Sequence, residues 1–522
     1  MIARQGLLVT LNNVLGAAQG FIALFLIARY MGDAALGSRA YALALVSLVG
    51  IVARLGFPTT HVRRIARGEE TGPSVGAFLA LKAGLTGLFM LVAGGAAWLW
   101  FTGLGRTVTD TTPTALVLAF WIVVVQSLRD VPVATFQGLR RIRERETVLL
   151  VNTTVTVALT ALVAVAFAAS HGRWSPIPGL GERLLGLLGI TGPMGLDTGI
   201  DLLMAAALVA EATALVLAVV LFLRARVPVA KPTRPVLASY LVFTLPLMLL
   251  AVGEVATKWS SQVLLGFWWD ASELGQFAAP SKLSEVFLLL GSSLSVVLLP
   301  VLSTLHGKGR DGEARELAHQ AERWTSLLLW PAVVVVALVP GPIIHVLLSD
   351  RFARGAATLV LLSVQALATS LLLPVQALAI GSGRPRFAAR VILATLAASL
   401  LLDILLIPER IGPFVLLGLG ATGAALASLG ATLLAFILYR VPSASWPGHS
   451  FLRRSLVVHA GAAGLVFLVF RLAPIPAPAH VIELALYAAA VLALYAALLL
   501  AIRELRRADW QQLLAMLTSK SP

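Results

Sequence analysis

The chain contains no cysteine. That absence excludes disulfide bridges, thiolate metal sites and a cysteine nucleophile, and it leaves the cellular compartment open. Charged residues are also scarce, because they make up only 12% of the 522 residues, whereas 58% are hydrophobic. A soluble globular chain averages about 25% charged residues, so this chain has too little polar surface for a water-soluble enzyme. Its hydrophobic content excludes a disordered chain as well. What remains is a polytopic membrane protein.

Fourteen apolar windows have the length of about 20 residues that a helix needs to cross the hydrocarbon core. They begin near Gly6, Ala40, Val75, Ala115, Val148, Ile200, Ser239, Phe277, Thr325, Ala357, Ala388, Phe414, Ser455 and Val481. The first window is too long for the apolar core of a cleaved signal peptide, so we expect an uncleaved span. The sequence predicts an all-α polytopic membrane protein of about 14 transmembrane helices.

The formal net charge of +15 is distributed unevenly across the predicted membrane. With the N-terminus inside, 26 of the 40 Lys and Arg residues lie on cytoplasmic segments, nine lie on the opposite side and five lie within spans. Because cytoplasmic loops are enriched in Lys and Arg, this bias predicts a multi-pass protein of the cell (inner or plasma) membrane with both termini in the cytoplasm. It also explains the basic excess without a nucleic-acid partner.

Three sequence features recur in the same order, about 237 to 245 residues apart. The paired features are the turns Asp33–Gly37 and Asp270–Gly275, the prolines Pro58 and Pro300 before basic loops, and the span exits Gly138–Arg141 and Gly383–Arg386. They predict two six-helix lobes related by a pseudo-two-fold axis along the membrane normal. We expect an N-lobe at 1–235, a C-lobe at 236–440, and two additional helices with a cytoplasmic tail at 441–522. Such repeats are typical of transporters that work by alternating access.

The loops offer little for catalysis. The largest predicted external loop, 170–199, holds two acids and one histidine, and the eight histidines of the chain are scattered without ligand spacing. We therefore predict neither a catalytic residue nor a metal site. Gly418, Gly420 and Gly423 spell the G-x-G-x-x-G of dinucleotide-binding proteins, but no acid follows between Glu409 and Glu483. We interpret these glycines as small residues that let helices pack closely.

Ionisable residues inside spans are costly, and they usually face a cavity or a partner. Four cations are candidate ligands for an anionic head group, namely Arg54, Lys282, Lys82 and Arg129. Arg54 and Lys282 lie in spans that correspond under the repeat, and arginine matches a pyrophosphate best. Three acids are candidates for a coupling Na⁺ or H⁺ site, namely Glu254, Glu211 and Asp403.

Mutual neutralisation is the alternative interpretation of these charges. Glu254 and Lys258 are spaced i,i+4, Lys282 and Glu285 are spaced i,i+3, and each pair would therefore share one helical face. Arg129 and Asp130 are neighbours in sequence and are candidates for structural pairing. Lysines near a membrane interface also extend their ammonium groups toward water, which is a second alternative for Lys82.

Three stretches carry a family resemblance, and they are Leu26–Gly37, Gly266–Leu302, and Ala379–Leu429 with its Gly383-Arg384 turn, Leu405–Pro408 element and Gly418–Ala425 run. These stretches resemble the polysaccharide and O-antigen flippases of the multidrug/oligosaccharidyl-lipid/polysaccharide exporter superfamily. The resemblance covers roughly residues 1–440. One departure is Lys258-Trp259, which stands where relatives often place an Asp–Arg-like pair. An acid-based cation site there would need Glu254, one turn earlier.

The resemblance implies a flippase for cell-surface polysaccharide biosynthesis, with no catalytic activity. Its substrate would be a polyprenyl-pyrophosphate-linked oligosaccharide, carried from the cytoplasmic to the outer face by alternating access. Arg54 and Lys282 would hold the diphosphate, and an ion gradient or the membrane potential would supply the energy, with Na⁺ or H⁺ as the only cofactor. Membrane lipids, a polymerase and glycosyltransferases of the same pathway are the expected partners. The alternatives are a lipid II flippase and a cation-coupled multidrug exporter of the same superfamily.

Overall fold

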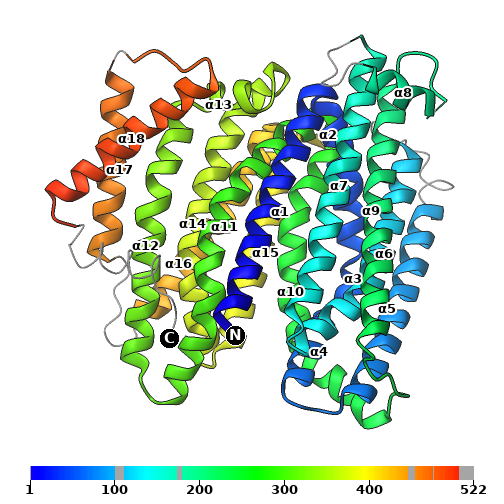
Figure 1. Ribbon diagram of the computed structural model, residues 1–522. Coiled ribbons are helices and arrows are strands. Elements are labelled where there is room, and N and C mark those ends of the chain that lie inside the picture. Colours follow the sequence, from blue (N-terminus) through cyan, green and yellow to red (C-terminus); the bar gives the residue numbers. More distant parts are fainter. Residues whose placement is uncertain are drawn as a thin grey trace. The chain divides into compact units, whose positions relative to one another are not determined.

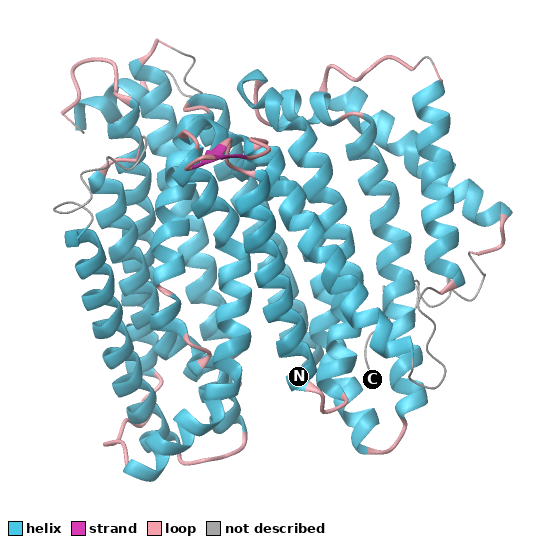
Figure 2. Ribbon diagram, turned by 180° about the vertical axis from the view of Figure 1, so that it is seen from behind, coloured by secondary structure: helices cyan, strands magenta, loops and turns pink. Residues whose placement is uncertain are grey.

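The computed structural model describes residues 2–99, 111–172, 179–187, 189–444, 453–473 and 475–504, and these residues are almost entirely helical (Figure 1). The helices are α1 (Ile2–Tyr30), α2 (Asp33–Val49), α3 (Ile51–Arg54), α4 (Phe57–Ala66), α5 (Thr71–Leu99), α6 (Pro113–Gly138), α7 (Ile142–Ser170), α8 (Leu180–Leu187), α9 (Leu196–Arg224), α10 (Arg234–Trp268), α11 (Ala271–Gly307), α12 (Asp311–Leu338), α13 (Pro340–Leu347), the 3-10 helix η2 (Asp350–Gly355), α14 (Ala356–Gly381), α15 (Pro385–Leu406), α16 (Gly420–Ala444), α17 (Arg454–Leu472) and α18 (Val481–Ala501). Strands β1 (Arg410–Ile411) and β2 (Phe414–Val415) form a small antiparallel hairpin (Figure 2).

Thirteen of the 14 predicted windows begin within a helix, whereas the window near Phe414 begins at strand β2, six residues before α16. Among the described residues, 11 helices are long and apolar enough to cross a membrane, or 12 if one bent pair counts as a single span. The seventh and eighth windows are covered by α10 and α11, which contain 35 and 37 residues. At about 1.5 Å per residue, both exceed the roughly 30 Å thickness of the hydrocarbon core. The predicted all-α polytopic membrane fold is confirmed.

The second predicted span is broken. The axis bends by 52° between α2 and the stretch Ile51–Ala66 that follows it. Leu55 and Gly56 both have positive φ, 26° and 70°, where α3 ends and α4 begins. Pro58 is the second residue of α4 rather than the end of the span, and it fits there because the first turn of a helix needs no N–H donor.

The chain forms two compact units. Unit 1 comprises residues 1–279 and 403–424, and unit 2 comprises residues 280–402 and 425–522. The predicted lobe boundaries at 235 and 440 stay predictions.

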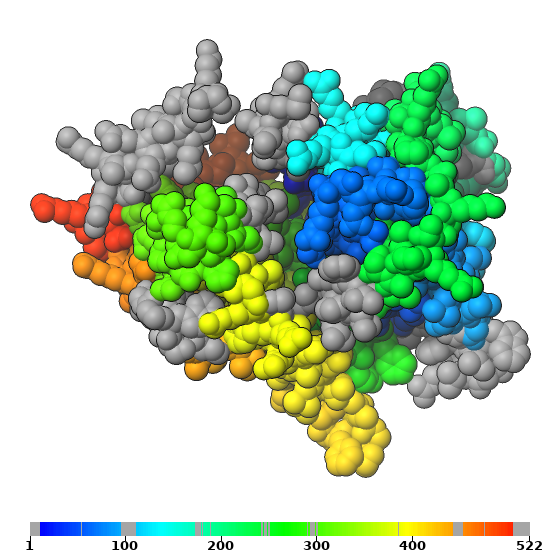
Figure 3. Space-filling model, turned by 90° about the horizontal axis from the view of Figure 1, so that it is seen from below, coloured from blue at the N-terminus to red at the C-terminus, as the bar shows by residue number. Residues whose placement is uncertain are grey.

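Within unit 1, the three basic connections predicted to be cytoplasmic lie at one end, the lower end in Figure 1. They are the connections α4–α5, α6–α7 and α9–α10. The third touches the first turn of α5, which directly follows the first connection, because the Ala230 amide donates to the Gly72 carbonyl at 3.0 Å. Figure 3 shows these two segments, blue and green, side by side. The shared end agrees with the distribution of basic residues in the sequence.

Within unit 2, the additional helices α17 and α18 pack against α12. Their shared core is formed by Val334, Ala462, Ala463, Val466, Val491, Tyr495 and Leu499. Beyond α18, the Glu504 carbonyl accepts a hydrogen bond from Arg323 Nη2 of α12 at 2.7 Å. Small residues such as Ala462 and Ala463 allow this close packing between membrane helices. The additional pair is therefore an integral part of unit 2.

Candidate functional site

Two neighbouring residues of α6 carry opposite charges to different helices of unit 1. Arg129 Nη1 lies 2.8 Å from Glu211 Oε2 of α9. Asp130 Oδ2 accepts a hydrogen bond from Lys82 Nζ of α5 at 2.9 Å, and Lys82 also donates to the Ala53 carbonyl at 3.1 Å. We call Lys82, Arg129, Asp130 and Glu211 the α6 charge quartet. Its formal charges cancel, and Glu211 lies at the middle of α9.

Further hydrogen bonds hold the acidic end of the quartet. The amides of Gln126 and Asn152 donate to Glu211 Oε1 at 2.9 and 3.1 Å, so this carboxylate receives donors from α6 and α7. The side chains of Arg129 and Glu211 are 12% and 8% exposed, and that of Lys82 is fully buried. Removing one partner of a buried pair costs about 3–5 kcal/mol, because a charge is left uncompensated. The quartet therefore fastens α5, α6, α7 and α9 to one another.

The quartet contains three of the residues predicted from sequence to form sites. Lys82 and Arg129 were candidates for substrate binding and Glu211 for ion coupling, whereas the structure gives each of them a partner within unit 1. Arg129 and Asp130 do not pair with each other, because they point to different helices. A substrate or ion that engaged these groups would have to displace a buried partner. Their roles in transport stay predictions.

Lys282 has a different environment. Its ammonium group donates to both carboxylate oxygens of Glu285, at 3.1 and 2.8 Å, as the i,i+3 spacing predicts. The two side chains are 58% and 39% exposed, and exposed pairs of this kind contribute only about 0–1 kcal/mol. Lys282 can therefore exchange its partner at little cost. Arg54 ends α3, and its side chain lies outside the described residues.

The two other acidic candidates also differ from each other. Asp403 is fully buried, and its Oδ2 accepts a hydrogen bond from Ser261 Oγ at 3.0 Å. Glu254 is exposed on α10, and one turn later Lys258 Nζ lies 5.2 Å from the centroid of the Trp259 ring. The three predicted acids thus differ in burial and in partners, because Asp403 is buried, Glu254 is exposed and Glu211 is paired with Arg129. Their assignment to ion coupling stays a prediction.

The two repeat turns, far apart in sequence, meet in unit 1. Asp33 Oδ2 accepts hydrogen bonds from Ser272 Oγ at 2.5 Å and from Gln276 Nε2 at 3.2 Å. A Cβ on Gly37 would lie 1.7 Å from the carbonyl oxygen of Ala271, and a Cβ on Gly275 would lie 2.3 Å from that of Asp33. Because the two glycines hold corresponding places in the repeats, the contact is reciprocal, as a two-fold relation requires. We call it the reciprocal turn contact.

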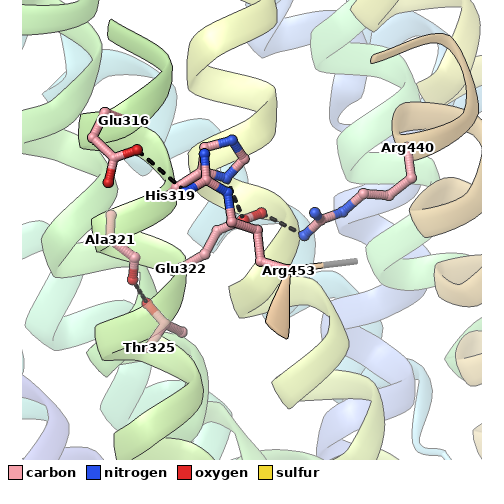
Figure 4. Close-up of polar contacts among 7 residues, drawn as sticks. All are labelled: Glu316, His319, Ala321, Glu322, Thr325, Arg440 and Arg453. Atoms are coloured by element: carbon pink, nitrogen blue, oxygen red, sulfur yellow. Dashed lines mark hydrogen bonds and ion pairs between the residues drawn. The ribbon is translucent and has the colours of Figure 1, made fainter. Parts of the chain in front are cut away.

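A buried ionic cluster in unit 2 escaped the sequence analysis (Figure 4). Arg440 Nη2 of α16 donates to Glu322 Oε1 of α12 at 2.5 Å, and His319 Nδ1 lies 3.3 Å from Glu322 Oε2. Arg453 and Glu316 add a more exposed pair at 3.2 Å. The spacing of Glu316, His319 and Glu322 along one helix face was the available signal, whereas Arg440 lies 118 positions after Glu322 in the chain. Among the described residues, no group of three or more His, Asp or Glu residues could hold a metal ion.

Long apolar helices with ionic pairs inside the spans define a polytopic membrane protein. Two family models, each described as "Polysaccharide biosynthesis protein", match residues 2–173 and 197–356. A protein of Haloferax volcanii named "Probable flippase AglR" is 26% identical over 274 residues. That match covers 50% of this chain and 54% of the relative, so it spans about half the length of the curated relative.

Solved structures show the same fold at low sequence identity. The lipid II flippase MurJ in an inward closed conformation has a TM-score of 0.70 at 12% identity, over 95% of this chain and 99% of that one. An inward-facing multidrug resistance MATE transporter has a TM-score of 0.59 at 12% identity, over 82% and 94% of the two chains. The fold is thus that of a membrane transporter. Together these matches confirm the predicted resemblance to the polysaccharide flippases of the multidrug/oligosaccharidyl-lipid/polysaccharide exporter superfamily.

Proposed function

We propose that the protein translocates a polyprenyl-pyrophosphate-linked oligosaccharide from the cytoplasmic to the outer face of the cell membrane by alternating access. The observation that carries this proposal is the match of two polysaccharide biosynthesis families over residues 2–173 and 197–356. The uneven distribution of Lys and Arg supports cytoplasmic termini. A lipid II flippase and a cation-coupled multidrug exporter are the competing functions.

In this proposal the diphosphate is held by Arg54 and Lys282, while the lipid tail stays in the bilayer. The exposed pair of Lys282 with Glu285 supports the role of Lys282, because a diphosphate replaces Glu285 without uncovering a buried charge. Lys82 and Arg129 keep their partners in the α6 charge quartet, which holds the helices of unit 1 together. Because the formal charges of the quartet cancel, Lys82 and Arg129 add no net positive potential, and they contribute by holding the helices in place rather than by direct contact with the substrate.

The reciprocal turn contact closes the end of unit 1 opposite its basic connections, and we propose that it opens when the substrate is released. Small residues and hydrogen bonds suit a contact that forms and breaks, since little apolar surface is exposed on opening. For coupling to Na⁺ or H⁺, Glu254 is the best placed of the three acids. It forms no ion pair among the described residues, whereas Glu211 would have to release Arg129.

The proposal is tested with purified protein in liposomes that contain a polyprenyl-pyrophosphate oligosaccharide with a fluorescent sugar. A membrane-impermeant quencher removes only the outer-leaflet signal without the protein, and we expect it to remove nearly all the signal when the protein is present. Lipid II and a cationic drug serve as competing substrates. Faster movement of either one, with no flipping of the oligosaccharide lipid, would contradict the proposal.

Substitutions then test the binding residues. We expect Arg54→Ala and Lys282→Ala to slow flipping, whereas Arg67→Ala and Lys308→Ala remove exposed loop charges and serve as matched controls. Equal rates in all four variants would leave the function standing but refute the site.

A further inference from the structure

The connection between α15 and α16 lies in unit 1, whereas most of both helices lies in unit 2. Residues 385–402 of α15 and 425–444 of α16 lie in unit 2, whereas residues 403–424 lie in unit 1. We call residues 403–424 the strap. The chain therefore leaves unit 2, packs on unit 1 and returns within one connection, which includes the β1–β2 hairpin (Figure 2).

The strap is an ordered element rather than a loose loop. Backbone hydrogen bonds close it, from Leu416 to Glu409 and from Leu419 to Leu406, both at 2.9 Å. Two glycines of the G-x-G-x-x-G motif, Gly418 and Gly420, have positive φ of 62° and 52°, which glycine adopts without strain.

The third glycine of the motif, Gly423, serves a close approach. A Cβ there would lie 2.6 Å from the Leu406 carbonyl oxygen. The motif thus shapes the strap, and the interpretation of its glycines as helix-packing residues was incomplete.

Three side-chain hydrogen bonds fasten the strap to the end of α10 and the start of α11. Ser261 Oγ donates to Asp403 Oδ2 at 3.0 Å, and Trp269 Nε1 donates to the Ile407 carbonyl at 2.8 Å. The Ala421 amide donates to Glu273 Oε1 at 2.9 Å. Ala421 is the second residue of α16, so the Glu273 carboxylate lies at a helix N-terminus, where a negative charge is favourable.

We propose that the strap moves together with residues 261–279 as one body during transport, with Glu273 as the positioning residue that holds the start of α16. The inference rests on the proposed alternating access. Bending would then occur where the helices leave this body. In α11 this point is Pro280, which removes a backbone hydrogen bond and permits a bend.

Neighbouring residues of α11 make two contacts with opposite expected behaviour. Glu273 holds the strap, whereas Ser272 and Gln276 hold Asp33 in the reciprocal turn contact. The first contact joins parts that we expect to travel together. The second joins the two repeats, which we expect to separate. A covalent link across each contact therefore distinguishes a permanent attachment from a gate.

The natural absence of cysteine makes this experiment clean, since introduced thiols react without background. One variant carries Glu273→Cys with Ala421→Cys, and a second carries Asp33→Cys with Ser272→Cys. Both are reconstituted and bridged with a short thiol-specific crosslinker. We expect the bridge at the strap to leave the flipping rate within about twofold of the unbridged variant, and the bridge at the turns to lower it about tenfold or more, because gating motions limit such cycles.

The possible outcomes distinguish a failure of the strap proposal from a failure of the proposed flippase function. If the unbridged variants flip no substrate but wild type does, Glu273→Gln supplies the test, because it keeps an acceptor for the Ala421 amide. Glu273→Gln should keep both the flipping rate and the KM for the substrate. Glu273→Ala should lower the flipping rate and leave the KM unchanged. If wild type flips nothing, the proposed function fails. If the unbridged strap variant is active and its bridged form is not, the strap detaches during transport and the inference is overturned.

A control pair and a hinge variant complete the design. Glu273→Cys with Gly412→Cys, in the hairpin turn, should form no bridge if the strap is anchored as described. Pro280→Ala should slow flipping at unchanged KM, because it restores a backbone hydrogen bond that stiffens α11 at the proposed bend. A bridge in the control pair would contradict the anchoring, and an unchanged rate for Pro280→Ala would contradict the bend.

Discussion

Gly37 is the residue at which a single methyl group should have the largest structural effect. In Gly37→Ala the new Cβ would lie 1.7 Å from the carbonyl oxygen of Ala271, and contacts under 3.0 Å are essentially never observed for Cβ atoms. The obstacle is backbone, which cannot rotate away as a side chain can. The starts of α2 and α11 must therefore move apart by more than 1 Å.

The magnitude follows from overpacking and from the hydrogen bonds of Asp33. Overpacking a tight contact costs about 1–3 kcal/mol, and the loss of the Ser272 hydrogen bond adds about 0.5–1.5 kcal/mol. For a chain of 522 residues, a total of about 2–4 kcal/mol corresponds to a fall in Tm of about 2–4 °C. Because the contact is reciprocal, Gly275→Ala should have an effect of the same size.

The assay is thermal unfolding of the purified protein in detergent, followed by fluorescence. Gly84→Ala in α5 is the matched control, since nothing lies within 4 Å of a Cβ at that position. There alanine should be neutral, or stabilising by up to about 1 kcal/mol through its helix propensity. A Tm of Gly37→Ala equal to that of Gly84→Ala would refute the close approach of the repeat turns.

Three further predictions concern the ionic pairs. Arg129→Ala should lower the free energy of unfolding by about 3–5 kcal/mol because it leaves Glu211 buried and unpaired, and adding Glu211→Leu should recover part of that loss in chemical denaturation. Lys282→Ala should lower the free energy of unfolding by less than about 1 kcal/mol, since its ion pair is exposed. It should nevertheless raise the KM for the lipid-linked substrate, and an unchanged KM would count against substrate binding at Lys282. Arg440→Met should destabilise unit 2 unless Glu322→Gln accompanies it, which limited proteolysis of the two variants would measure.

The helices were predictable because each needs only a local signal, an apolar run of about 20 residues. The break in the second span was not, because it depends on positive φ at Leu55 and Gly56 rather than on Pro58, the residue that attracts notice in the sequence. The internal repeat was visible as recurring turns, and the structure adds that those turns touch.

Charge pairing was predictable only within a helix. The i,i+3 geometry brought Lys282 to Glu285 as expected. The pairs Arg129–Glu211 and Arg440–Glu322 join residues 82 and 118 positions apart, so they depend on which helix faces meet. That is decided by tertiary packing, which one sequence does not encode as a pattern. For the same reason adjacent Arg129 and Asp130 looked like partners, although they serve different helices.

The strap also has a consequence for biogenesis. Unit 1 receives its last 22 residues only after about 120 residues of unit 2 have been synthesised and inserted. Until then Ser261, Trp269 and Glu273 lack the partners that they have in the finished protein. Assembly of unit 1 therefore waits for a late, long-range contact, and contacts of that kind are slow to form. A nascent chain halted before residue 403 exposes this unfinished surface to the insertion and quality-control machinery of the membrane.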